Sequence, residues 1–222
     1  MRYLVATGRP SDHGVMTEIV DLTDPSMSCL TEDIPYRFSS AGGLLGTTPV
    51  ICGGWGGTQS GLLNECLLYG TSQVITMNSR RSYFASVALN KSMLWMMGGW
   101  DGNNRYDSTE FITTDGSING PTLPEAIYNT CAVKFTETGS VYLVGGNNGG
   151  STYTNNVWVA NPSNEFSFTQ GPSLVTNRGV HACGTMSIGA KSIILAAGGY
   201  NNIHLSSVEI LDPLSNQWVA GK

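Results

Sequence analysis

Arginine and large aromatic residues recur at two fixed positions along this sequence. Arginine, or once tyrosine, stands four residues before an alanine four times, and an aromatic residue directly follows three glycine pairs. The first set is Arg37, Arg81, Tyr128 and Arg178, and the second set is Trp55, Trp100 and Tyr200. These are the residue types enriched at interface hot spots. The pattern predicts ligand binding, although a residue at a repeat position can also brace neighbouring repeats.

Other residues with catalytic or metal-binding chemistry fit structural roles better. Glu18, Glu65, Glu110 and Glu209 each fall in a predicted third strand of a repeat, where Trp158 takes the position once. The histidines, His13, His181 and His204, lie in different units and lack the close spacing of a zinc site. We interpret His181 as a packed core histidine. The segments 101–104 and 147–150 predict tight hairpin turns, since neither has the acidic residues of a calcium loop. The sequence predicts no metal, no cofactor and no enzymatic activity.

The elements that position these residues follow the regular spacing of the glycine pairs. The pairs end at Gly8, Gly54, Gly99, Gly146 and Gly199, at intervals of 46, 45, 47 and 53 residues. A period in this range indicates propeller blades or solenoid units. An apolar run precedes each pair, a third apolar segment follows it, and Pro-Asn turns lead into Phe166 and Trp218. Each unit therefore predicts three or four short β-strands.

These features resemble the kelch-repeat family of β-propellers. The resemblance rests on the apolar runs with Gly-Gly, on the segments 98–102, 198–202 and 207–213, and on Trp218. It implies an all-β, kelch-type propeller with four complete four-stranded blades and one incomplete blade, about five in all. Kelch propellers more often have six or seven blades, so the chain is also compatible with a fragment of a larger propeller.

We interpret residues 1–222 as one propeller domain made of five units. The boundaries are approximately 1–36, 37–80, 81–127, 128–177 and 178–222. The first unit lacks an innermost strand, because no segment before Tyr3 supplies one. An unpaired edge exposes backbone donors and acceptors. We therefore expect either imperfect ring closure or self-association through open edges.

Composition excludes several classes of function. The net charge is −5 and the 11 basic residues are scattered, so a nucleic-acid interface is not predicted. No apolar run reaches the roughly 20 residues of a membrane span. The five cysteines have no Cys-x-x-Cys spacing, so we expect buried reduced thiols and a reducing, cytoplasmic location.

In the propeller layout, the arginine set and the aromatic set open on the same face. In kelch substrate adaptors this face holds peptides, with arginines taking acidic side chains. The resemblance thus implies a noncatalytic module that binds an acidic protein or peptide through Arg37, Arg81, Tyr128, Arg178, Trp55, Trp100 and Tyr200. The alternative is a kelch-type enzyme or sugar-binding propeller similar to the sialic acid mutarotases.

Overall fold

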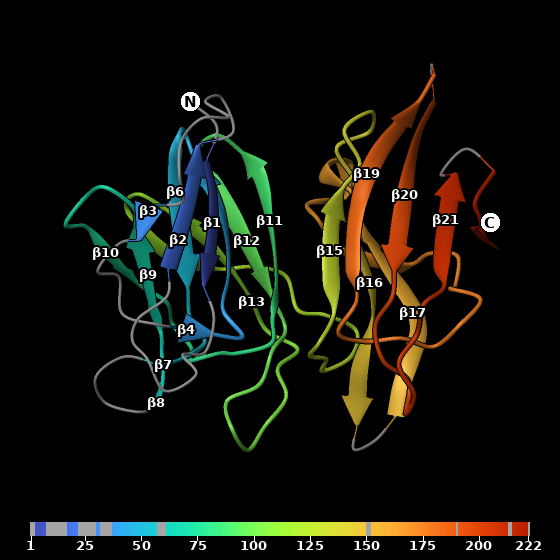
Figure 1. The fold of residues 1–222 in the computed structure, drawn as a ribbon, viewed down its shortest axis with the longest axis horizontal. Coiled ribbons are helices and arrows are strands. Elements are labelled where there is room, and N and C mark those ends of the chain that lie inside the picture. Colours follow the sequence, from blue (N-terminus) through green and yellow to red (C-terminus); the bar gives the residue numbers. More distant parts are fainter. Residues whose placement is uncertain are drawn as a thin grey trace.

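The computed structural model describes residues 3–7, 17–21, 30–31, 37–56, 61–149, 152–189, 191–212 and 215–221, the first three of these ranges by their backbone alone. These residues form antiparallel β-sheets (Figure 1). No α-helix occurs among them, and a single 3-10 turn, η1, covers Pro162–Asn164. The predicted all-β class is confirmed.

The strands follow the units in chain order. The first unit contributes β1 (Tyr3–Thr7), β2 (Thr17–Asp21) and β3 (Leu30–Thr31). The second contributes β4 (Arg37–Phe38), β5 (Ala41–Leu45), β6 (Thr48–Cys52), β7 (Trp55–Gly56), β8 (Gly61–Leu62), β9 (Glu65–Leu68) and β10 (Val74–Thr76). The third contributes β11 (Ala85–Asn90), β12 (Met93–Met97), β13 (Thr109–Thr113) and β14 (Gly116–Asn119). The fourth contributes β15 (Cys131–Lys134), β16 (Val141–Gly149), β17 (Thr152–Ala160) and β18 (Phe168–Gln170). The fifth contributes β19 (Ala182–Ile188), β20 (Lys191–Ala197), β21 (Val208–Asp212) and β22 (Gln217–Ala220).

Each of the last four units contains a four-stranded sheet. Their orders are β5-β6-β9-β10, β11-β12-β13-β14, β15-β16-β17-β18 and β19-β20-β21-β22. The first unit has a three-stranded sheet, and the short strands β4, β7 and β8 form another, which the sequence did not predict. The inner strands β5, β11, β15 and β19 lie side by side in that order.

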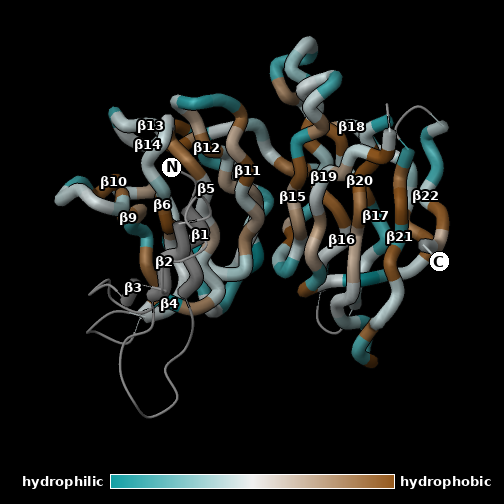
Figure 2. The backbone as a smooth tube through the Cα atoms, turned by 45° about the horizontal axis from the view of Figure 1, so that its top comes forward, coloured by the Kyte–Doolittle hydropathy of each residue, from teal (hydrophilic) through white to brown (hydrophobic). Residues whose placement is uncertain are grey.

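The apolar runs form strands because both of their faces are covered. Leu94, Trp95, Met96 and Met97 are all fully buried in β12. Alternate side chains enter the cores on either side of the sheet. Leu94 and Met96 pack with the second unit, and Trp95 and Met97 pack with the fourth. Apolar residues accordingly run along the strands, and hydrophilic residues gather in the turns (Figure 2).

The first glycine of a pair lets two units approach closely. Gly98 has a φ of +65°, and a Cβ atom there would lie 2.4 Å from the backbone oxygen of Ile127, which in the structure begins the fourth unit as Arg81 begins the third. Gly53 and Gly145 meet the oxygens of Arg81 and Arg178 at the same distance. A side chain at these positions would push the units apart, which explains why glycine recurs there at a regular interval.

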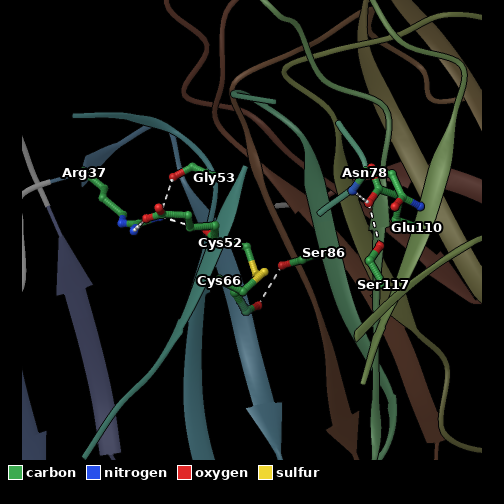
Figure 3. The surroundings of a disulfide bond; sticks show 10 residues. Arg37, Cys52, Gly53, Cys66, Asn78, Ser86, Glu110 and Ser117 are labelled. Carbon is green, nitrogen blue, oxygen red and sulfur yellow. Dashed lines mark hydrogen bonds and ion pairs between the residues drawn. A yellow bond between two sulfur atoms is a disulfide. The ribbon is translucent and has the colours of Figure 1, made fainter. Parts of the chain in front are cut away.

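The expectation of reduced thiols is wrong for four of the five cysteines. Cys52 and Cys66 face each other across β6 and β9 and form a disulfide (Figure 3). A second disulfide joins Cys131 of β15 to Cys183 of β19 and so connects two units. Spacing along the chain missed both pairs, because the contacts arise from strand register and from unit stacking. Cys29 lies outside the described residues.

These disulfides remove the argument for a reducing compartment, since disulfides persist mainly in oxidising ones. Within the described part of the chain, no helix has the length and apolar character to cross a membrane.

Candidate functional site

Two of the predicted ligand-binding arginines are buried inside their own blades. Arg81 and Arg178 are both 0% exposed. The Arg81 guanidinium donates to the backbone oxygens of Gly98 and Ser108 and forms an ion pair of 2.5 Å with Glu110. Arg178 repeats the arrangement, with an ion pair of 2.6 Å to Glu209. The expectation that these arginines face a ligand is therefore wrong: they brace the glycine pair against the third strand.

The carboxylates of these pairs also hold the segment that leads into each blade. Glu110 accepts hydrogen bonds from the backbone N–H groups of Asn78 and Ser79 and from the Ser117 hydroxyl (Figure 3). Glu209 accepts from the N–H groups of Val175 and Thr176. A buried ion pair needs such additional hydrogen bonds to offset desolvation. The predicted structural role is confirmed for these two glutamates.

Arg37 follows the same pattern less completely. Its guanidinium is buried and donates to the backbone oxygens of Gly53 and Glu65, and it lies 3.4 Å from the Glu65 carboxylate. Half of the Glu65 side chain is exposed. Cys66 pairs with Cys52, just before the glycine pair, as Thr109 pairs with Met97. Glu65 therefore occupies the position of Ser108 in the next unit. The position of Glu110 lies two residues further along the strand. The glutamates are therefore not one repeated set, and of Glu18 only the backbone is described.

The fourth unit replaces the whole arrangement. Its arginine position is held by Ile127 and not by Tyr128 as predicted, because Ile127 O accepts from Gly99 N–H as Arg81 O accepts from Gly54 N–H. Trp158 takes the glutamate position and donates from Nε1 to Glu125, which precedes Ile127 in the chain. The carboxylate has thus moved from the third strand to the connecting segment. Tyr128, one residue later, is partly exposed and packs against Trp100.

The aromatic residues do gather at one end of the sheets. Trp55, Trp100 and Tyr200 follow the second strands β6, β12 and β20, Tyr83 and Tyr128 precede the inner strands β11 and β15, and Tyr153 lies at the start of the third strand β17. Ring contacts join Trp55 to Trp100, Trp100 to Tyr128, and Tyr83 to both Trp100 and Tyr128, with centroids 6.2 to 6.4 Å apart. Tyr153 and Tyr200 form a further pair at 5.6 Å. All six rings are partly exposed. We call this set, Trp55, Tyr83, Trp100, Tyr128, Tyr153 and Tyr200, the aromatic face.

The backbone fixes these rings in place. Trp100 forms a bridge with Ser82 and with Arg105, and Tyr200 bridges Gly179 and His204. The indole Nε1 of Trp55 donates to Ser82 Oγ at 3.1 Å, which connects the second unit to the third. Burial raises the pKa of Tyr128, and Tyr153 adds to this effect. The aromatic face is therefore preorganised across several units.

An exposed cation lies beside the aromatic face. Arg105 is exposed, its guanidinium lies against Gly149, and its charge opposes the rise in the pKa of Tyr128. No ion pair within the described ranges involves Arg105. The repeat pattern missed Arg105, Tyr83 and Tyr153 because the residue types at their positions change from unit to unit, as Tyr83, Asn129 and Val180 show. A count of aromatic and basic residues in the segments that follow the glycine pairs would have found Arg105 and Tyr153, but not Tyr83.

The neighbouring turn is structural. Asp101 accepts hydrogen bonds from the N–H groups of Asn103 and Asn104 and from the Tyr106 hydroxyl. These bonds lower the pKa of Asp101. The segment forms the turn that its sequence predicts. No cluster of three metal-binding side chains occurs within the described ranges.

Both ring nitrogens of His181 are buried, as expected for a packed histidine, although the residue as a whole is half-buried. Its ring lies against Gly145 and its Cβ against Gly199, and neither ring nitrogen has a hydrogen-bond partner among the described residues. Burial lowers the pKa of His181 to about 4, and the nearby charge of Arg178 acts in the same direction. The imidazole is therefore neutral at pH 7.

Comparison with known proteins agrees with this architecture. Residues 190–221 match the family model described as the Kelch motif. No curated protein matches the chain. The matched segment contains β20, β21 and β22, together with the glycine pair, Tyr200 and the Glu209 that binds Arg178. The last unit thus contains a kelch motif, and this match supports the resemblance of the chain to kelch-repeat proteins.

Proposed function

We propose that this protein is a noncatalytic interaction module whose aromatic face binds a segment of a protein or peptide. The observation that carries the proposal is the run of partly exposed rings, from Trp55 through Trp100 to Tyr128, held by contacts across units. Rigid aromatic residues supply large contact area at little entropic cost, and they are typical anchors of binding surfaces.

Arg105 gives this surface its charge preference. Four basic side chains already form ion pairs with carboxylates within the described ranges. They are Arg37, Arg81, Arg178 and Lys191. Arg105 is exposed next to Trp100 and Tyr128 and has no such partner in the described ranges. An acidic side chain of the ligand would complete a charge-assisted hydrogen bond there. We therefore propose a ligand with an apolar or aromatic group next to a carboxylate.

Selection from a displayed peptide library tests the proposal. The immobilised wild-type protein is the bait, and a folded Trp100→Ala, Arg105→Ala double variant removes peptides that bind elsewhere. Enriched sequences should pair an acidic residue with an aromatic or apolar one. Trp100→Ala alone should weaken their binding by about 1 to 2 kcal/mol, as expected for a hot-spot truncation.

Ile118→Ala provides the matched control, because Ile118 is 57% exposed on the outer strand β14. This variant should bind the selected peptides as the wild type does. Peptides whose affinity is unchanged by both Trp100→Ala and Arg105→Ala would contradict the proposal. Turnover of a carboxylated sugar by the purified protein would instead support the enzyme alternative.

A further inference from the structure

Neighbouring units are joined by a repeated set of three backbone hydrogen bonds. At the junction of the second and third units, Gly54 N–H donates to Arg81 O at 2.9 Å, and Arg81 N–H donates to Leu63 O at 3.3 Å. The third bond runs from Tyr83 N–H to Ser39 O at 3.0 Å. The receiving unit thus offers one donor and two acceptors, and the entering segment offers the complement.

The same three bonds occur at the next two junctions. At the junction of the third and fourth units they join Gly99 to Ile127 O, Ile127 N–H to Tyr106 O, and Asn129 N–H to Tyr83 O, at 2.8, 3.1 and 2.8 Å. At the junction of the fourth and fifth units they join Gly146 to Arg178 O, Arg178 N–H to Thr154 O, and Val180 N–H to Asn129 O, at 2.8, 3.2 and 2.9 Å. The residue that makes the last bond is left-handed each time, with φ of 55° at Tyr83, Asn129 and Val180.

The fifth unit offers the same three groups on its outer side. Leu205 N–H donates to Gly199 O, as Leu63 does to Gly54 O and Tyr106 to Gly99 O, so Leu205 holds the equivalent acceptor position. The equivalent groups are therefore Gly199 N–H, Leu205 O and Val180 O. None of these groups has a hydrogen-bond partner in the part of the chain that the structure describes. They border an open hollow of about 460 Å³ lined by Val180, Gly199, Tyr200, His204 and Leu205, which we call the fifth-unit groove.

We propose that the fifth-unit groove binds an extended segment of a partner protein by the backbone pairing that joins the units to one another. A first residue of the segment would donate its N–H to Leu205 O and accept from Gly199 N–H through its carbonyl. Its second following residue, in a left-handed conformation, would donate to Val180 O. Main-chain pairing of this kind gives affinity in many peptide complexes, and side-chain pockets give specificity.

The groove also defines the composition of the segment. Proline cannot stand at either donor position, because it lacks an N–H group. Glycine or asparagine suits the left-handed position, as Asn129 shows in the fourth unit. The walls contributed by Val180 and Leu205 favour an apolar side chain. Val180 is 61% exposed, so a ligand there would cover an apolar surface that is now in contact with solvent.

A different protein fits the groove better than a second copy of this chain. The matching segments that begin at Arg81, Ile127 and Arg178 are each already bound within their own chain, and the segment that begins at Arg37 is held in strand β4, which pairs with β7 of its own unit. A second copy would have to break three existing hydrogen bonds to supply one of them. A partner with a free extended segment has no such cost.

A peptide taken from this chain is a suitable probe. We choose the sequence of residues 81–87, acetylated and amidated, with a fluorophore at its C-terminal end. It should bind the wild-type protein saturably in fluorescence anisotropy. N-methylation of the arginine or of the tyrosine should weaken binding about tenfold for each lost hydrogen bond. N-methylation of the serine between them is the control and should have a smaller effect, because Ser82 N–H points to Trp100 O in its own unit.

Two protein variants locate the site. Val180→Lys places a charge in the groove and should abolish probe binding. Ile188→Lys makes the same change at a position of similar exposure, 56% against 61%, and should leave binding unchanged. Trp100→Ala should also have no effect, which separates this site from the part of the aromatic face around Trp100, although the groove shares Tyr200 with that face. Circular dichroism confirms that each variant is folded.

Several results would overturn the proposal. These are absence of saturable binding, equal affinity of all three N-methylated peptides, or equal effects of Val180→Lys and Ile188→Lys. Sedimentation of the protein alone tests whether a second copy of this chain occupies the groove. If the protein self-associates and Val180→Lys makes it monomeric, the groove binds a second copy and the proposed partner is wrong.

Discussion

At the scale of single residues, the repeat arginines and the aromatic residues have separate roles, although both recur with the glycine pairs. Arginine at the start of an inner strand predicts a charged surface if its side chain points outward. The structure turns Arg81 and Arg178 inward, onto the carbonyl groups that the left-handed glycines expose and onto a buried carboxylate. The side chains of the aromatic face stay partly exposed.

The buried pairs predict a sharp contrast between two glutamates. Glu110→Gln leaves the Arg81 charge buried without a counter-charge and should lower the free energy of unfolding by about 3 to 5 kcal/mol. Glu65→Gln removes a half-exposed carboxylate 3.4 Å from Arg37. It should cost less than about 1 kcal/mol. Urea unfolding of both variants measures the difference, and equal losses would contradict the structural role of Glu110.

His181 predicts a pH dependence of stability. Its pKa is about 4 in the folded protein, against an unfolded value of 6.5, so the unfolded chain binds the extra proton between these values. The contribution to stability is complete above pH 6.5 and is lost as the pH falls toward 4. The loss approaches about 3 kcal/mol at about 1.36 kcal/mol per pKa unit.

Carboxylate groups also titrate in this pH range, so the test compares the wild type with a variant that lacks the histidine. Urea unfolding of the wild type and of His181→Leu is compared from pH 7 to pH 4. The wild type should lose more stability on acidification than the variant. Parallel curves would show that His181 is not held neutral in the folded protein.

At the scale of strands and units, the glycine beat was sufficient to predict an all-β chain with antiparallel sheets. It could not fix the register of the fourth unit, where Tyr128 is one residue from the true arginine position. Sequence spacing favoured Tyr128 because Ala132 follows it by four residues, but Cys131 and not Ala132 pairs next to the glycine pair. Ile127 carries no signal of its own, since its carbonyl and not its side chain makes the repeated contact.

The disulfides were missed for a related reason. Each depends on which residues face each other, and single-residue slips in register change that entirely. Cys52 and Cys66 meet across adjacent strands of one sheet, whereas Cys131 and Cys183 meet between two sheets. Only the second pair therefore couples two units.

The second disulfide predicts a measurable contribution to the stability of the pair of units. It closes a loop with a sequence separation of 52 residues, against 14 for Cys52–Cys66. Replacing Cys131 and Cys183 by serine should cost about 2 to 4 kcal/mol in the free energy of unfolding. Mild reduction followed by alkylation and mass spectrometry should label Cys131 and Cys183 before the fully buried Cys52 and Cys66. Simultaneous labelling of all four would contradict this order.

At the scale of the whole molecule, the sequence predicted the end of the sheets at which the aromatic residues gather better than it predicted the exposed cation beside them. The propeller layout brings the loops after each glycine pair to one end, and Trp55, Trp100 and Tyr200 lie there with Tyr83 and Tyr153. The expectation of arginines on this surface is wrong for Arg37, Arg81 and Arg178, which are buried, because burial of a side chain follows from packing between strands and not from spacing along them. Arg105, from a turn outside the repeat pattern, supplies the exposed charge instead.

The most direct test of the account follows the five tryptophan side chains during a peptide titration. Trp55 and Trp100 lie on the aromatic face, whereas Trp95, Trp158 and Trp218 contribute to the cores between units. Nitrogen-15 labelled indole groups give one NMR signal for each residue. On addition of an acidic peptide selected as described above, the signals of Trp55 and Trp100 should shift together and saturate, and the other three should stay unchanged. Unchanged signals from Trp55 and Trp100 on saturation with a bound peptide would contradict binding at the aromatic face.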